Sequence, residues 1–281
     1  MHANFYALGA IALWATLASL GVTLSHVPPF LLTGLALVIG SVPAWPLARQ
    51  WKVATPTLAL GIYGLFGFHF LLFIALRHAP AVEANLVNYL WPLLIVLFSA
   101  LLPGERLKLA HVAGALVGLA GVVVLIAGRG AIRADAAHLP GYLCAFAAAF
   151  VWSGYSVLSR RFGSVPTDAV AGFCLATAAL SFLCHLAFEA TVWPASPTEW
   201  LAILALGVGP VGAAFYVWDI GVKRGDIRVL GIASYAAPVL STLILVLAGY
   251  AEPSLSLAVS CALIVSGAAV ATLARRRTVI A

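Results

Sequence analysis

The run "NYLWPLLIVLFSALLPGERL" at residues 88–107 opens with side chains that can bind a ligand. Asn88, Tyr89 and Trp91 offer an amide, a phenol and an indole, and Pro92 follows them. Because proline has no N–H, the carbonyl of Asn88 loses its partner within a helix. In hydrocarbon such a carbonyl must face protein or a wet cavity. We therefore predict a bent helix that lines a cavity, or a kink whose free carbonyl bonds a neighbouring side chain.

A second run, "SYAAPVLSTLILVLAGYAEPSL", repeats this pattern 146 residues later. Its Ser234, Tyr235 and Pro238 follow the polar, tyrosine and proline order of the first run. A further proline interrupts the apolar run before it. The predicted kinks are at Pro92, Pro210 and Pro238.

Aromatic side chains also occur in the middle of other apolar runs, away from the ends where interface anchors are expected. Aromatic faces suit a ligand with an apolar or aromatic body and can hold an ammonium group by cation–π contact. Ordinary core packing is the alternative for each residue taken singly. We expect the set to line a pocket, and the candidate substrate-binding residues are Trp14, His69, Phe70, Asn88, Tyr89, Trp91, Trp152, Tyr155, Tyr216, Ser234 and Tyr235.

Ionisable side chains are scarce inside the apolar runs. His69 lies deepest, as a proton-relay candidate or as a neutral hydrogen-bonding group of the pocket wall. Asp219 and Lys223 have the i,i+4 spacing of a helix pair near the end of a run, and Glu83 is placed to pair with Arg77. The sequence therefore does not favour a sodium site or a carboxylate relay at the midplane. The four cysteines show no metal-ligand spacing, and we expect neither a metal nor a cofactor.

The elements that carry these residues are membrane helices. The chain is 63% hydrophobic and 9% charged, which no soluble fold of this size accommodates. The net charge of +6 does not indicate nucleic-acid binding, because the cations lie in short gaps between apolar runs. We predict an all-α membrane protein with ten spans, at approximately 4–24, 30–48, 57–77, 80–102, 107–127, 139–159, 167–188, 199–222, 227–249 and 255–273.

The positive charges predict the orientation of these spans. With the termini inside, twelve of the fifteen Lys and Arg residues fall in cytoplasmic segments. We therefore expect both termini in the cytoplasm and no cleaved signal peptide.

Small residues in the fifth and tenth spans predict close packing of helices, at Gly114 and Gly118 and at Ala262 and Ser266.

The two halves of the chain look alike, and each would hold five spans. Because five is odd, equivalent helices cross the membrane in opposite directions. We predict an inverted repeat, with residues 1–137 and 138–281 as the two five-helix units around a central cavity. This architecture is typical of secondary transporters that work by alternating access.

The ten spans, the two halves and the Gly-Glu that ends the fourth span, at Gly104, resemble the EamA-type branch of the drug/metabolite transporter superfamily. The start of the run, from Asn88 to Pro92, resembles more specifically the bacterial aromatic amino acid exporters of the YddG type. The resemblance implies a multi-pass protein of the bacterial inner membrane, a monomer or weak homodimer, that exports aromatic and other neutral amino acids.

An amino acid needs an acceptor for its ammonium group, donors for its carboxylate and an apolar slot. Asn88, Ser234 and the freed carbonyls could meet the first need, and Asn88, His69 and tyrosine hydroxyls the second. Hydrophobic drugs or other small metabolites are the alternative cargo. An intramembrane enzyme or a pore is not favoured, because the spans hold no paired acids, metal cluster or charged ring.

Overall fold

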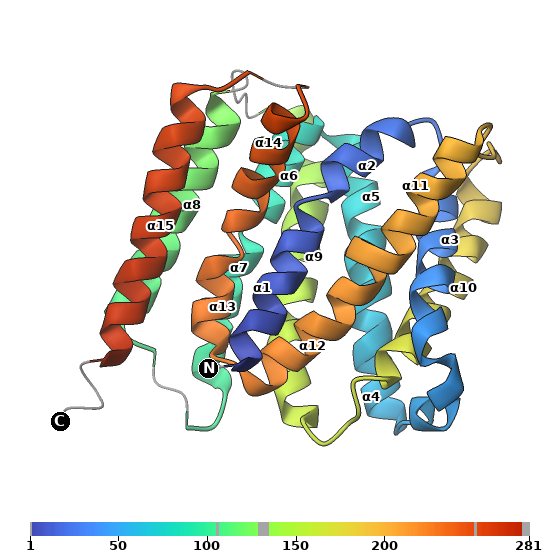
Figure 1. Cartoon of the computed structure of the whole chain (residues 1–281), viewed down its shortest axis with the longest axis horizontal. Helices are drawn as coiled ribbons and strands as arrows, with labels where there is room; N and C mark the ends of the chain where they lie inside the picture. Colours follow the sequence, from blue (N-terminus) through green and yellow to red (C-terminus); the bar gives the residue numbers. More distant parts are fainter. Residues whose placement is uncertain (1, 105–106, 129–134, 250–251, 277–281) are drawn as a thin grey trace.

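The computed structural model describes residues 2–104, 107–128, 135–249 and 252–276, and in these ranges the chain forms helices and no strand (Figure 1). The first half contains α1 (His2–Trp14), α2 (Leu17–Thr23), α3 (Pro29–Ser41), η1 (Val42–Trp51), α4 (Thr55–Ile62), η2 (Tyr63–Gly67), α5 (Phe68–His78), α6 (Ala81–Asn88), α7 (Trp91–Phe98), η3 (Ser99–Leu101) and α8 (Leu109–Ala127). The second half contains η4 (Ala136–His138), α9 (Leu139–Leu158), η5 (Ser159–Phe162), α10 (Ala169–Phe188), α11 (Pro197–Val208), η6 (Gly209–Ala213), α12 (Ala214–Arg224), α13 (Ile227–Ala233), α14 (Ala236–Leu247) and α15 (Leu255–Arg276).

Eight helical stretches of the described chain are long and apolar enough to cross a membrane, and two shorter apolar helices, Ala3–Trp14 and Leu255–Ala271, accompany them. Large apolar side chains also cover the outside of the bundle. Leu109 is 85% exposed and Leu247 is 87% exposed, which suits lipid and not water. The chain is therefore a multi-pass membrane protein.

The expected continuous span at 4–24 is interrupted in the structure. α1 ends at Trp14 and α2 begins at Leu17, and between them the hydroxyl of Thr16 donates to the carbonyl of Leu13 at 2.7 Å. A threonine side chain that bonds a carbonyl one turn earlier offers the backbone an alternative to the α-helix. The break places Trp14 at the end of α1 and not in the middle of a longer helix.

Helix breaks also accompany the three prolines. α6 ends at Asn88, four residues before Pro92, and Tyr89 and Leu90 form a turn before α7. A similar turn separates α13 from α14 ahead of Pro238, and Pro210 lies inside the π-helical turn η6. The turn η2 is also π-helical, and it begins 146 residues before η6, the same spacing that separates Asn88 from Ser234.

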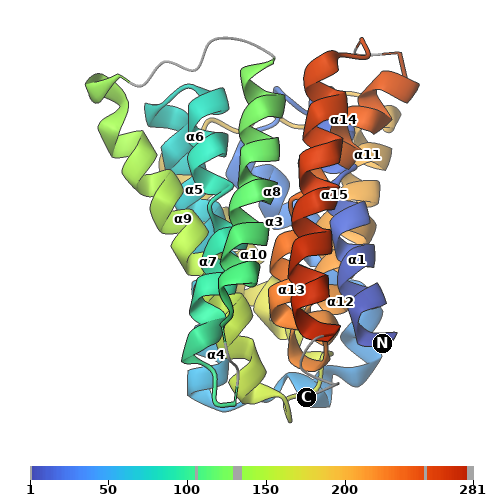
Figure 2. The same cartoon turned by 90° about the vertical axis from the view of Figure 1, so that its left-hand side faces the viewer.

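Four helix pairs dominate the packing: α8 with α15, α3 with α10, α1 with α12 and α5 with α9 (Figures 1 and 2). The backbones of α8 and α15 come close at glycine residues. A Cβ added at Gly114 would lie 2.5 Å from the carbonyl oxygen of Gly267. A Cβ added at Gly118 would lie 2.6 Å from the Tyr235 ring. Close packing at the two predicted glycines is confirmed. Ala262 and Ser266 are both exposed, and Gly267 makes the contact with α8 instead. Close packing at Ala262 and Ser266 therefore stays a prediction, for a contact between protomers.

α1 begins and α15 ends at the same end of the bundle, which we call the termini end (Figure 1). α9 and α12 also end there, while α5 and α10 end at the opposite, far end. Helices from the two halves of the chain pack directly against one another, as the four dominant pairs show.

Candidate functional site

Four indole rings meet where α1, α7, α9 and α12 come together. The centroid of the Trp14 ring lies 5.1 Å from Trp218, 5.7 Å from Trp152 and 6.2 Å from Trp91. Trp91 and Trp218 meet edge to face at 6.0 Å, and Trp152 and Trp218 stack at 6.3 Å. We call these four residues the tryptophan cluster. Three of them were candidates from the sequence, and Trp218 completes the group.

Further aromatic rings extend the cluster on one side. Tyr155, Phe68 and Phe215 lie 5.4, 5.5 and 5.8 Å from Trp152, and the ring of His69 meets Phe215 at 6.3 Å. Tyr155 is almost fully buried. The residues around the cluster thus form an apolar and aromatic surface, with His69 at its edge.

His69 is held in one tautomer by the backbone. Its Nδ1 lies 2.7 Å from the carbonyl oxygen of Leu65, which can only accept a hydrogen bond. Nδ1 therefore carries the proton, and in the neutral ring Nε2 is an acceptor. The neutral histidine suits an ammonium group better than the carboxylate that we expected it to bind.

The indole N–H groups of the cluster divide into two kinds. Trp14 Nε1 donates to the carbonyl of Pro210 at 3.1 Å, and Trp218 Nε1 donates to the hydroxyl of Ser156 at 3.1 Å. Among the described residues, the N–H groups of Trp91 and Trp152 have no acceptor. They are therefore available as donors to a ligand.

Asn88 carries an unused acceptor near the break between α6 and α7. The side chain is 7% exposed, and its Oδ1 is buried without a hydrogen-bond partner in the described structure. Three residues later, the carbonyl of Trp91 accepts a bond from the Ser153 hydroxyl at 2.8 Å. A buried amide oxygen without a partner costs free energy, so it marks a position where a ligand would supply the missing donor.

The remaining candidates have other contacts, although Tyr216 packs against the same apolar core as the tryptophan cluster. Phe70 packs on Phe30 and Phe66, and the hydroxyl of Tyr216 donates to the carbonyl of Gly40 at 3.1 Å. The hydroxyl of Ser234 donates to Leu230 of its own helix. Tyr89 and Tyr235 pack in a second apolar core with α8 and α15. A role of these five candidates in substrate binding stays a prediction.

Asp219 is a further candidate functional residue. From the sequence we expected it near the end of a span, but the structure buries its side chain. Its side chain is 2% exposed, and Oδ2 lies 2.8 Å from both Lys223 Nζ and Thr167 Oγ1. The i,i+4 spacing with Lys223 was visible in the sequence. The burial was not, because it depends on the packing of α9 and α10 against α12.

The far end carries a different ion pair from the one expected. Arg77 pairs with Glu189 at 3.3 Å, so its predicted pairing with Glu83 is wrong. Glu189 also accepts the backbone N–H groups of Phe30 and Leu31 at the start of α3, where an anion is favoured. His185 also lies 2.9 Å from Glu189 with i,i+4 spacing. The anchoring of α3 and Arg77 by Glu189 could not be read from the sequence, since these partners lie more than a hundred residues away.

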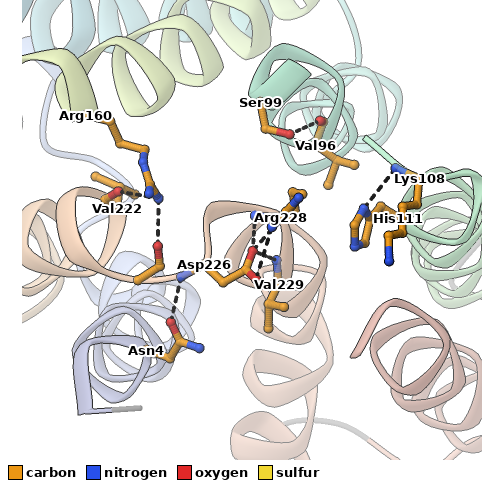
Figure 3. A network of polar contacts seen from close by, with 11 residues as sticks. Asn4, Val96, Ser99, Lys108, His111, Arg160, Val222, Asp226, Arg228 and Val229 are labelled. Atoms are coloured by element: carbon orange, nitrogen blue, oxygen red, sulfur yellow. Dashed lines mark hydrogen bonds and ion pairs between the residues drawn. The ribbon is translucent and has the colours of Figure 1, made fainter. Parts of the chain in front are cut away.

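At the termini end, a polar network joins α1, η5 and the α12–α13 connection (Figure 3). The guanidinium of Arg160 donates to the carbonyls of Val222 and Gly225 at 3.3 and 2.7 Å. Asn4 Oδ1 accepts the backbone N–H of Asp226 at 2.9 Å. Burial raises the pKa of the Asp226 carboxyl, but hydrogen bonds and the charge of Arg228 outweigh it and hold that pKa below its ordinary value.

The described residues contain no group of three or more His, Cys, Asp or Glu that could hold a metal ion. Aromatic faces, two free indole donors and one buried amide acceptor are what the site offers. Such groups bind a small ligand and do not supply a nucleophile.

The model of the EamA-like transporter family matches residues 1–127 and again 139–273. The chain belongs to the EamA-like transporter family. It is therefore a membrane transporter and not an enzyme. The family region appears twice, and each match covers one half of the chain.

Two relatives and one solved structure are similar over nearly the whole chain. The aromatic amino acid exporter YddG of Ancylobacter novellus is 62% identical, over 95% of this chain and 96% of the relative. The protein of the same name from Escherichia coli is 26% identical, over 98% of both chains. A crystal structure with 60% identity superposes with a TM-score of 0.95, over 99% of this chain and 98% of that one.

Proposed function

We propose that this transporter exports aromatic and other neutral amino acids across the bacterial inner membrane by alternating access, as a monomer or weak homodimer. The tryptophan cluster is the observation that carries the proposal within the structure. The name of the relative with 62% identity supports the same cargo.

The chemistry of the site suits both parts of an amino acid. The tryptophan cluster offers ring edges and faces to an aromatic side chain. Asn88 Oδ1 and the acceptor nitrogen of His69 would receive the ammonium group, and the free indole N–H groups of Trp91 and Trp152 would donate to the carboxylate. In this arrangement the amide oxygen of Asn88 gains the partner that it otherwise lacks.

Two inverted five-helix repeats, residues 1–137 and 138–281, would provide the alternating access. Matched features support this proposal: π-helical turns at η2 and η6, broken helices at α6–α7 and α13–α14, and turns with positive φ at Gly104 and Gly249. The pairing of α1 with α12 matches that of α9 with α5, as a pseudo-two-fold axis requires. In this proposal ten helices span the membrane: the eight long apolar stretches, α15 and the broken α1–α2.

The termini end would face the cytoplasm. Arg160, Arg161, Lys223, Arg224 and Arg228 all lie at helix ends on that side. On the opposite side, Glu189 and Glu199 lie at helix ends. An excess of Lys and Arg marks cytoplasmic segments.

A hydrophobic drug or neutral metabolite is the second candidate cargo. The observation in its favour is that, in the part of the chain that the structure describes, no Lys or Arg contacts the rings of the tryptophan cluster to neutralise a carboxylate. An uncharged apolar molecule would need no such group.

Counterflow in liposomes tests the proposal. Liposomes preloaded with unlabelled phenylalanine should take up labelled phenylalanine and tryptophan faster than lysine or glutamate. Trp152→Ala should weaken the apparent affinity for tryptophan about tenfold, which corresponds to about 1.4 kcal/mol. The apparent affinity for alanine should fall less. Uptake of lipophilic cations without uptake of any amino acid would instead assign the second cargo.

A further inference from the structure

Asp219 and Lys223 form a buried ion pair inside a membrane helix. Their side chains are 2% and 8% exposed, and the two charged atoms lie 2.8 Å apart. A buried ion pair contributes little net stability, because desolvation offsets the attraction. Charged groups within membrane helices are expensive, and they commonly mark ion pathways or proton relays. A role in transport would explain why the pair is present.

The pair connects the substrate region to the closure of the termini end. Asp219 follows Trp218 of the tryptophan cluster directly in α12. Lys223 Nζ also donates to the carbonyl of Val165 at 3.0 Å, and Thr167 donates to the Asp219 carboxylate. Both partners belong to the segment that enters α10. The charge state of Asp219 therefore sets how firmly α12 is held to this segment.

Other titratable or charged groups around the pair come from each neighbouring element. Asp168 precedes α10, and Tyr155 of α9 lies within electrostatic range of Asp219. Arg224 follows Lys223 in α12, and Arg160 of η5 is bound to the carbonyl groups at the end of α12. Asp226 and Arg228, at the start of the next helix, form an ion pair with each other. Lys223 is the cation in direct contact with the Asp219 carboxylate.

The two halves of the chain differ at this point. The offset of 146 residues places Phe73 opposite Asp219 and Arg77 opposite Lys223. The cation therefore has a counterpart in the first half, but the buried acid does not. Arg77 finds its acid on another helix, at Glu189, and is 39% exposed. One buried acid at this point of the repeat agrees with the binding of one proton in each transport cycle.

We propose that Asp219 is the proton-binding site that couples amino acid export to proton entry, a proposal that rests on the proposed function. A proton from the outside binds a carboxylate oxygen of Asp219 and removes its charge. Lys223 then loses its counter-ion, the contact between α12 and the segment before α10 weakens, and the termini end opens. The proton leaves to the cytoplasm, the carboxylate pairs with Lys223 again, and the termini end closes.

Proteoliposomes with an acidic lumen test this coupling. In an antiport, protons leaving the lumen drive labelled phenylalanine inward, so the wild-type protein should accumulate it severalfold above the level without a gradient. Asp219→Asn keeps the hydrogen bonds but cannot titrate. It should retain counterflow at equal pH and lose the response to the gradient. Glu252→Gln, at an exposed carboxylate outside the site, should behave as wild type.

Asp219→Asn leaves Lys223 without a counter-ion, and the single variant could fail to fold for that reason. The double variant Asp219→Asn/Lys223→Gln removes both charges and tests proton coupling in that case. It should also show counterflow without gradient-driven accumulation. A wild-type protein that ignores the gradient, or either variant that still follows it, overturns the proposal. Loss of counterflow in both variants would assign the pair a structural role, and would overturn it too. Absence of counterflow in the wild-type protein would instead contradict the proposed function.

Discussion

At the scale of single residues, Asn88 offers the sharpest test of substrate binding. Asn88→Leu removes the unpartnered Oδ1, so the protein should lose no thermal stability. A hydrogen bond to a charged group is worth about 1.5–3 kcal/mol, so the apparent affinity for phenylalanine should fall roughly ten- to hundredfold. Concentration-dependent counterflow and a thermal-shift assay measure the two effects.

Asn85 provides the matched control for this substitution. It lies in the same helix, and its amide donates to the carbonyl of Ala81 at 2.8 Å. Asn85→Leu should therefore leave the affinity unchanged. If Asn88→Leu bound phenylalanine as tightly as the wild-type protein, Asn88 would have no part in binding the ammonium group.

Residue identity predicted part of the candidate site. Trp14, Trp91 and Trp152 stood out because large aromatic groups in mid-helix are unusual, and the structure brings them together. Tyr235 has the same character but packs against Gly118 in the second core. Which way a mid-helix aromatic points depends on the rotation of its helix. That rotation is set by neighbours that the local sequence does not contain.

At the scale of elements, the contact between α8 and α15 depends on glycine. Gly114→Ala should lower the thermal stability, because its Cβ would meet the backbone of Gly267, which cannot move aside. Overpacking of this kind costs about 1–3 kcal/mol. Thermal unfolding in detergent measures the change.

Gly9→Ala is the control at this scale. Gly9 also lies in a helix, but a Cβ there would have nothing within 4 Å. Replacing a helical glycine by alanine without a clash should raise stability slightly, by about 0.5–1 kcal/mol. If Gly114→Ala and Gly9→Ala changed the thermal stability equally, helix propensity and not the close approach of α8 and α15 would govern the effect at Gly114.

The sequence located the helices well because each membrane span needs a long apolar run. It did not predict the break between α1 and α2, since that break depends on a hydrogen bond of Thr16 inside an otherwise suitable run. It also did not predict the π-helical form of the turns at η2 and η6. Pro210 indicated a kink at η6, whereas η2 contains no proline.

At the scale of the whole molecule, the two ends of the bundle should be accessible from opposite sides of the membrane. In a protein without its native cysteines, Asp135→Cys should react with an impermeant maleimide on intact cells. Lys52→Cys should react only after permeabilisation. Both positions are exposed. Asp135 precedes η4 and α9, and α9 begins at the far end, while Lys52 lies between η1 and α4, and α4 lies at the termini end (Figure 1). The reverse pattern of labelling would place the termini outside.

The overall architecture was predictable because the bilayer restricts what a chain this apolar can form. The count and spacing of apolar runs indicated a helical multi-pass protein, and the motifs at Asn88 and Gly104 indicated its family. The contacts that join distant segments, such as Arg77 with Glu189, were not predictable. Their partners follow from the folded arrangement alone.

The π-helical turn at η6 also bears on how this protein could change over generations. A π turn holds one more residue than an α turn. Deleting one residue between Gly209 and Ala213 would therefore turn η6 into an ordinary α turn and leave the face of α12 that carries Trp218 directed at the other three indoles. The same deletion in a regular α-helix would rotate everything after it by about 100° around the helix axis, because each residue accounts for that angle. The loss of one codon should thus be tolerated at η6 and disruptive one turn further along α12.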